Sequence, residues 1–225
     1  MMKRLKRAAL ILMTLFLTLS AGPVALLRVF DPPTSAFMLT RQWQLFWQRG
    51  VPWGIDYRWR PYSRISVNLK RAVIASEDQK FATHHGFDFA QIEQALTDYR
   101  HGKPLRGAST LSQQTAKNLF LAASRSWLRK LLETWFTVLL ELILSKQRIL
   151  EIYLNIAEFG DGIYGAEAAS QQFFNRSASD LNEAQAALLA SVLPNPKQRQ
   201  ASHPSPVMRQ KQQWILQQMR LVTLP

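Results

Sequence analysis

The sequence predicts a mostly α-helical protein with one membrane anchor at its N-terminus. Three observations lead to this prediction. Residues 8–27 form an apolar run of twenty residues without a charge, which at about 1.5 Å per helical residue matches a hydrocarbon core of about 30 Å. Beyond residue 68, apolar residues recur at helical spacing and strand-like alternation is nearly absent. Hydrophobic residues make up 47% of the 225, which is enough for a sizeable core.

The anchor at 8–27 follows a basic tail, residues 1–7, that contains Lys3, Arg4, Lys6 and Arg7. Basic residues before a membrane span predict a cytoplasmic N-terminus and export of the chain that follows. A cleaved signal peptide is the alternative, because small residues at 20–22 follow a shorter apolar core. We favour an uncleaved anchor, since apolar sequence resumes at residues 24–27. Export also argues against nucleic acid as a partner.

The chain is strongly basic, with 28 Lys and Arg against 15 Asp and Glu and a net charge of +13. The part that follows the basic tail still carries 24 basic and 15 acidic residues. This balance predicts an anionic partner, such as an acidic membrane surface or a phosphorylated substrate. The chain has no cysteine, which excludes disulfides, Cys-ligated zinc and thiol nucleophiles.

A juxtamembrane segment at residues 28–62 is rich in aromatic and basic side chains. A helix-breaking stretch at residues 31–35 opens it. Its aromatic residues are Trp43, Trp47, Trp53, Tyr57, Trp59 and Tyr62, interleaved with Arg41, Arg49, Arg58 and Arg60. Such a mixture suits the membrane interface. An ordinary aromatic mini-core is the alternative interpretation.

Residues 63–225 are predicted to form a single helical domain. The expected helices cover residues 68–79, 88–100, 108–122, 125–145, 146–157, 163–174, 180–193 and 206–221. Asp180 and Glu183 have the spacing of a capping box at the start of one of them. The very apolar stretch 127–144 predicts a central buried helix, part of which could lie against lipid.

Three polar features stand out from the helical background. Glu77 and Asp78 end an apolar helix, where an acid pair is often no more than a solvated terminus. The stretch 106–118 is small, polar and rich in hydrogen-bonding groups, and its Gly, Ser and Thr residues suit a phosphate at a helix N-terminus. Glu133 lies in the most apolar helix, where its carboxylate needs a partner or a function. Arg129 and Lys130 are spaced to pair with it.

These features resemble five motifs of the peptidoglycan glycosyltransferases, glycosyltransferase family 51. Residues 77–86 match EDxxFxxHxG, residues 107–118 match G(G/A)STxxQQxxKN, and residues 129–133 match RKxxE. Residues 149–155, with Gly160, Gly165, Ala168 and Phe174, resemble the fourth motif, and residues 187–196 are similar to the fifth. Departures are few: Ala108 replaces a frequent Gly, and Thr137 a frequent Ala.

The resemblance implies a lysozyme-like, mostly α-helical fold with a larger head and a smaller membrane-associated jaw. It also implies polymerisation of lipid II into β-1,4-linked glycan strands, with inversion and release of undecaprenyl diphosphate. The larger relatives carry a transpeptidase domain, but no Ser-x-x-Lys or Lys-Thr-Gly occurs here. The sequence is therefore identified as a member of the monofunctional type, without transpeptidase activity.

The resemblance assigns roles to residues one by one. Glu77 is the general base that takes the proton from the acceptor hydroxyl, and Glu133 is a second acid that assists the leaving group or positions cations. Apolar neighbours suit Glu77 to this role by raising its pKa. The residues expected to bind substrate are Asp78, Phe81, His84, Ser109, Thr110, Gln113, Gln114, Lys117, Asn118, Arg125, Arg129 and Lys130.

The expected partners are lipid II, the growing glycan strand, the lipid bilayer and other wall-synthesis and division proteins. A divalent cation, Mg²⁺ or Mn²⁺, is expected with the substrate diphosphate, and no organic cofactor is expected. The predicted location is the inner membrane, crossed once, with the catalytic domain on the periplasmic face.

Two other functions fit parts of the same pattern. A lysozyme-like glycosidase or lytic transglycosylase would release soluble muropeptides from isolated cell wall. A non-catalytic scaffold for wall synthesis would tolerate loss of Glu77.

Overall fold

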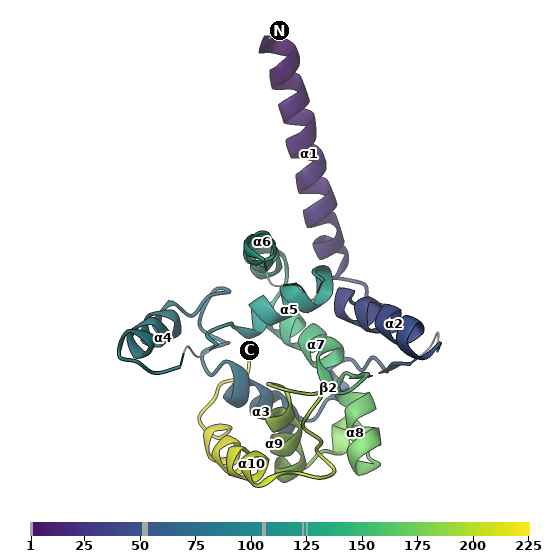
Figure 1. Ribbon diagram of the computed structural model, residues 1–225, viewed down its shortest axis with the longest axis vertical. Coiled ribbons are helices and arrows are strands. Elements are labelled where there is room, and N and C mark those ends of the chain that lie inside the picture. Colours follow the sequence, from purple (N-terminus) through teal and green to yellow (C-terminus); the bar gives the residue numbers. More distant parts are fainter. Residues whose placement is uncertain (1, 51–53, 105–106, 123, 125) are drawn as a thin grey trace.

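The computed structural model describes residues 2–50, 54–104, 107–122, 124 and 126–225. Helices dominate the described residues (Figure 1), which confirms the predicted fold class. The α-helices are α1 (Met2–Leu26), α2 (Ala36–Arg49), α3 (Val67–Glu77), α4 (Phe89–Arg100), α5 (Leu111–Phe120), α6 (Trp127–Ile143), α7 (Lys146–Ile156), α8 (Ala166–Phe174), α9 (Glu183–Val192) and α10 (Pro206–Gln218).

The first helix, α1, projects away from the rest of the molecule (Figure 1). It is 25 residues long and is the one described helix that is long and apolar enough to cross a membrane. The predicted basic tail is part of this same helix. The C-terminal half of α1 contacts the domain, since the ring centre of Phe16 lies 5.4 Å from the ring centre of Trp135 on α6. The helix α1 is therefore joined to the domain by packing as well as by the chain.

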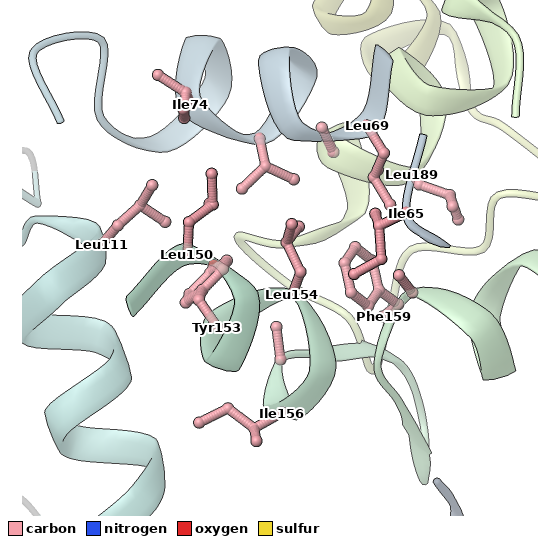
Figure 2. Packing of buried hydrophobic residues seen from close by; sticks show 14 of the residues in the cluster. Ile65, Leu69, Ile74, Leu111, Leu150, Tyr153, Leu154, Ile156, Phe159 and Leu189 are labelled. Atoms are coloured by element: carbon pink, nitrogen blue, oxygen red, sulfur yellow. The ribbon is translucent and has the colours of Figure 1, made fainter. Parts of the chain in front are cut away.

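The core forms where α3 packs against α9, α9 packs against α10, and α5 packs against both α6 and α7. Leu69 and Ile74 of α3 face Leu150 and Leu154 of α7 across this core (Figure 2), and all four are fully buried. Apolar residues three and four positions apart line one face of each helix. Burial of those faces fixes the C-terminal end of α3 next to α5 and α7.

A small sheet lies beside the helices, with strand order β1 (Asp56–Tyr57), β3 (Ile163–Tyr164), β2 (Glu158–Gly160). β1 pairs parallel to β3, and β2 pairs antiparallel to it. The expected helix 163–174 therefore begins three residues later, at Ala166, after a glycine. Gly165 has a φ of +85°, and a Cβ there would lie 2.4 Å from the carbonyl oxygen of Asn155. Only glycine fits this turn.

The expectation of a buried helix at 127–144 is wrong in its main part. In α6 the buried residues are Glu133, Thr137, Leu139 and Leu140. The opposite face is apolar and exposed, with Trp127 92% exposed and Leu142 77% exposed. The high hydrophobicity of α6 thus arises from two apolar faces, one packed on α5 and one exposed. An exposed apolar face is what the alternative of contact with lipid predicts.

Each of the two interpretations of the juxtamembrane aromatic residues describes a different part of the segment. Trp43 and Trp47 are about two-thirds exposed on α2, a helix that the sequence pattern did not predict. Tyr57, Trp59 and Tyr62 instead pack against the core, and the Tyr62 N–H donates to Glu151 at 2.6 Å. Trp53 lies outside the described residues.

The predicted capping box at Asp180 is also wrong. Residues 178–180 form a short 3-10 helix, η2 (Ala178–Asp180), and α9 begins three residues later, at Glu183. Its capping box joins Asn182 and Gln185, whose side chains each accept from the other's backbone N–H. Both pairs have the spacing that the motif requires, so spacing alone could not choose between them.

Glu167 ties the small sheet region to the helices and has a pKa of about 2. Burial would raise the pKa of this carboxyl, but hydrogen bonds from Arg60, the Ala178 N–H and Gln171 lower it. Because this pKa lies below the usual 4.5, the ionised side chain stabilises the fold above about pH 4.5. That stabilisation is lost as the pH falls toward about 2.

We therefore expect Glu167→Gln to lower the free energy of unfolding by about 1–3 kcal/mol at pH 7. The difference from wild type should shrink as the pH falls from about 4.5 toward 2. Thermal unfolding in detergent, followed by circular dichroism at several pH values, measures both effects. Glu93→Gln, which changes an exposed carboxylate on α4, is the control and should leave stability within about 0.5 kcal/mol. A pH-independent difference would contradict this account of Glu167.

Candidate active site

Glu77 is the last residue of α3 and faces a cleft of about 360 Å³. Its side chain is 13% exposed. The cleft is polar around it, with Gln79, Gln91 and Gln94 in its wall, and Trp214 of α10 closes one side. A carboxylate at a helix C-terminus faces the negative end of the helix dipole, so Glu77 depends on donors from other elements.

Three groups act as donors, one from α3 itself and two from other helices. The Ser76 hydroxyl donates to Glu77 Oε1 at 3.0 Å, and Gln114 Nε2 of α5 donates to Glu77 Oε2 at 3.2 Å. Lys211 Nζ of α10 lies 3.8 Å from Glu77 Oε1. The carboxylate is thus held from three helices and keeps an open side toward the cleft.

Tyr153 of α7 fixes the orientation of the Gln114 amide. Its hydroxyl donates to Gln114 Oε1 at 3.1 Å, which leaves the amide nitrogen facing Glu77, as an ionised carboxylate requires. Burial raises the pKa of Tyr153 well above its ordinary value, and the nearby charges of Glu77 and Asp78 raise it further. Tyr153 therefore stays protonated and acts as a permanent donor.

Asp78 connects the first two motifs. Its buried carboxylate accepts from the Leu111 N–H at 2.9 Å and contacts His84 Nε2 at 2.9 Å. The Thr110 hydroxyl donates to the Gly86 carbonyl at 2.6 Å. These bonds fasten the loop after α3 to the start of α5.

Several residues expected to bind substrate also build this junction. Asp78, Phe81, Thr110 and Gln113 are at most 5% exposed, and Thr110 and Gln113 form the capping box of α5. Asp78 also lines the first cleft. The contact of these four residues with substrate stays a prediction. Ser109, one residue before the cap, is exposed.

A second cleft, of about 300 Å³, is lined by Gln114, Lys117 and Asn118 of α5, together with Lys197. Burial lowers the pKa of Lys117, while the charge of Glu133 opposes this shift. Among the described residues its ammonium makes no ion pair, and it lies 5.6 Å from the centre of the Phe37 ring. A partly desolvated cation without a counter-ion is suited to an anionic ligand.

Glu133 is 2% exposed in α6, and both its oxygens are paired. Arg129 Nη1 lies 2.6 Å from Oε2 and Lys130 Nζ lies 2.5 Å from Oε1. This confirms the predicted intrahelical ion pairs. Arg129 and Lys130, which the motif assigns to substrate, are thus held in place by Glu133. Arg125 lies outside the described residues.

Two residues of the site were missed at the sequence level: Lys211, which contacts Glu77, and Trp214, which lines the first cleft. Both lie on α10, which follows the five motifs and showed only a general excess of positive charge. No local signal marks them, because their approach to Glu77 depends on how α10 packs against α3 and α9.

Residues 54–220 match the sequence profile of the family described as Transglycosylase. This range contains every site residue predicted from the sequence and covers most of the chain. The chain belongs to the transglycosylase family. The match begins at residue 54, within the segment expected to precede the domain, consistent with the contacts that Tyr57, Trp59 and Tyr62 make with the core.

Curated relatives share about half of their residues with this transglycosylase. A protein of Chromohalobacter salexigens is 51% identical over 219 residues, which cover 97% of this chain and 93% of the relative. A protein of Pseudomonas syringae pv. tomato is 53% identical and covers 89% of this chain and 85% of the relative. Both relatives are named biosynthetic peptidoglycan transglycosylase.

Lys211 gives a prediction about activity. Lys211→Gln removes the cation that lies 3.8 Å from Glu77 Oε1 and should lower kcat/KM by about two- to fivefold, because a partly exposed ion pair of this kind holds its carboxylate by up to about 1 kcal/mol. Lys211→Arg keeps the charge and should retain most of the wild-type value. The rate of glycan formation from lipid II in detergent measures the loss.

Arg209→Gln is the matched control, because it removes one positive charge from an exposed position on the same helix. An equal loss of activity in Arg209→Gln would mean that only the overall charge matters. An unchanged kcat/KM in Lys211→Gln would mean that the contact does not hold the carboxylate.

Proposed function

We propose that this chain is a monofunctional peptidoglycan glycosyltransferase that polymerises lipid II into β-1,4-linked glycan strands. One observation carries the proposal: Glu77 stands between two clefts. It lines the first, and Gln114, which donates to it, lines the second. A polymerase needs this arrangement, because its base must reach an acceptor hydroxyl on one side and a donor sugar on the other.

The first cleft suits the acceptor sugar. Its glutamine amides can donate to and accept from sugar hydroxyls, and Trp214 offers an aromatic face for the C–H surface of a sugar ring. In the proposed step Glu77 takes the proton of the acceptor 4-hydroxyl. The oxygen then attacks the donor anomeric carbon, the bond from that carbon to the diphosphate breaks with inversion, and the diphosphate leaves with the electron pair.

The second cleft suits the donor and its departing diphosphate. Lys117 and Lys197 bring positive charge, and Asn118 adds an amide donor. Negative charge that develops on the leaving oxygens is stabilised by these groups. A diphosphate needs no proton to leave, so a second carboxylic acid is not required.

Glu133 acts in this proposal as a positioning residue. Both of its oxygens are bound to cations of its own helix, so neither is poised to deliver a proton. Holding Arg129 and Lys130 in fixed positions would direct their remaining N–H groups toward the donor. This favours the second of the two roles that the family motif implies.

A divalent cation also stays a proposal. No group of three or more His, Cys, Asp or Glu side chains among the described residues could hold a metal, and both oxygens of Glu133 are occupied. The residues thus do not fit a resident metal cage. A Mg²⁺ or Mn²⁺ ion would instead arrive with the diphosphate, as Mg²⁺ commonly does with phosphate ligands.

The helix α1 and the exposed apolar faces of α2 and α6 support a location at a membrane. We infer one membrane crossing with a cytoplasmic N-terminus, which places the domain at the periplasmic surface of the inner membrane. The exposed rings of Trp43 and Trp47 and the outer face of α6 would rest in the interface. Packing of Phe16 on Trp135 supports an anchor that is retained, because a cleaved signal peptide would leave this contact unused.

We expect Glu77→Gln to abolish glycan formation from labelled lipid II, with a loss of at least about 100-fold, because an amide cannot accept the proton. Polymerisation in detergent, read out by gel separation of the glycan, measures the loss. Circular dichroism and thermal unfolding should match wild type. Glu93→Gln, at an exposed site on α4, is the control and should retain activity.

A folded Glu77→Gln protein with full activity would exclude Glu77 as the base. Release of soluble muropeptides from isolated cell wall, without glycan synthesis, would favour the glycosidase instead. A wild-type protein that does neither would favour the scaffold.

A further inference from the structure

A second carboxylate of α6, Glu141, is nearly buried and takes no part in the chemistry proposed above. Its side chain is 9% exposed, and among the described residues the lining of neither cleft includes it. It lies about two turns after Glu133. A carboxylate in so apolar a helix is costly unless it is paired, and both partners of Glu141 come from other helices.

Glu141 joins α6 to the beginning of α5 and to the beginning of α7. The Ser112 hydroxyl, in the first turn of α5, donates to Glu141 Oε1. Lys146 Nζ lies 2.7 Å from the same oxygen. This ammonium is also 4.6 Å from the centre of the Phe81 ring, whose face attracts a cation. Glu141 therefore has one fixed charged partner and one directional hydrogen bond to α5.

The surroundings of this contact are tightly packed. Ser112 is fully buried. Gly86, at the end of the first motif, has a φ of +86°, and a Cβ there would lie 3.1 Å from Glu141 Cγ and 3.0 Å from Thr137 Cγ2. The loop after α3 thus lies with its backbone against the same part of α6. Glu141 is enclosed by this loop and by two helices.

Two contacts determine how α6 lies along α5 (Figure 1). Glu141 meets Ser112, and Phe136 stacks on Phe120 with ring centres 4.4 Å apart. The later residue of α6 meets the earlier residue of α5, so the helices run in opposite directions where they touch. Apolar packing is non-directional and permits sliding, whereas a charge-assisted hydrogen bond has a defined geometry. Buried polar contacts of this kind can specify register.

The register of α6 decides where its cations lie. Glu133 holds Arg129 and Lys130. Burial lowers the pKa of Lys117 on α5, Glu133 opposes this shift, and the charges of Arg129 and Lys130 add to it. The three cations are therefore neighbours. A slip of one helical turn would move the two on α6 by about 5.4 Å relative to Lys117, well beyond the roughly 1 Å at which misplaced groups already impair catalysis.

We propose that Glu141 is a positioning residue whose bond to Ser112 sets the register of α6 against α5. This register holds Arg129 and Lys130 beside Lys117 at the second cleft. The role in catalysis rests on the proposed function, since these cations serve the departing diphosphate there. Glu141 itself touches no substrate.

The test removes the contact without leaving an unpaired charge. Glu141→Leu combined with Lys146→Met replaces the ion pair by apolar side chains of similar size, an exchange that is often neutral for stability. The midpoint of thermal unfolding should therefore stay within about 4 °C of wild type. The matched control is Asp56→Leu combined with Arg58→Met, which makes the same exchange in an ion pair at the small sheet.

With lipid II in detergent, kcat of the Glu141→Leu/Lys146→Met variant should fall about ten- to hundredfold, because displaced cations no longer stabilise the charge on the leaving oxygens. KM should change by less than about threefold, since this charge develops only after binding. The control should keep both values. An unchanged kcat, a rise in KM alone, or an equal loss in the control would overturn the positioning role.

A distance measurement tests the register without turnover. The chain has no cysteine, so spin labels can be attached at Leu131→Cys on the exposed face of α6, paired with Arg71→Cys on α3 or Gln217→Cys on α10, two exposed positions. Double electron–electron resonance is recorded on the full chain in detergent. Wild type and control should give the same narrow distance distributions, and the variant without Glu141 and Lys146 a broader or shifted one.

Unchanged distributions for both label pairs would overturn the assignment of register to Glu141, whatever the activity. If the wild-type chain does not polymerise lipid II, the proposed function fails, while the distance distributions still decide whether Glu141 sets the register.

Discussion

The whole site depends on the buried carboxylate of Asp78. A carboxylate inside a protein is costly unless it is fully paired, and Asp78 satisfies this need with His84 and with the first N–H of α5. These bonds hold the end of one helix against the beginning of another. Glu77 and Gln114 meet for that reason, since one precedes Asp78 directly and the other lies one turn into α5.

The residues of the second motif, at 107–118, fall into two groups with different roles. Lys117 and Asn118 follow Gln114 by three and four positions, so both lie near Gln114 on one face of α5. All three line the second cleft. Thr110 and Gln113 cap the helix that carries them. The motif therefore contains both residues that line the cleft and residues that fix the helix carrying them.

The first helix is fixed to the rest of the domain. Arg148 binds the backbone at the C-terminal end of α1, and α6 packs on the C-terminal half of α1. In the proposed function, this fixed position would keep the sugars of a membrane-bound lipid substrate at the level of Glu77. The exposed apolar faces of α2 and α6 and the overall positive charge would favour the same membrane location.

The sequence by itself determined the helical class, the long apolar N-terminal helix and the family, because periodicity, a long uncharged run and ordered motifs are local signals. It missed α2 and the strands, since elements of two or three residues, such as β1, form only through partners distant in the chain. Taken alone, the acid pair at residues 77–78 also suggested a solvated helix end, and the apolar stretch 127–144 suggested a core helix. Tertiary structure alone decided those burials and brought Lys211 to Glu77, because burial and long-range charge contacts depend on which helices pack together.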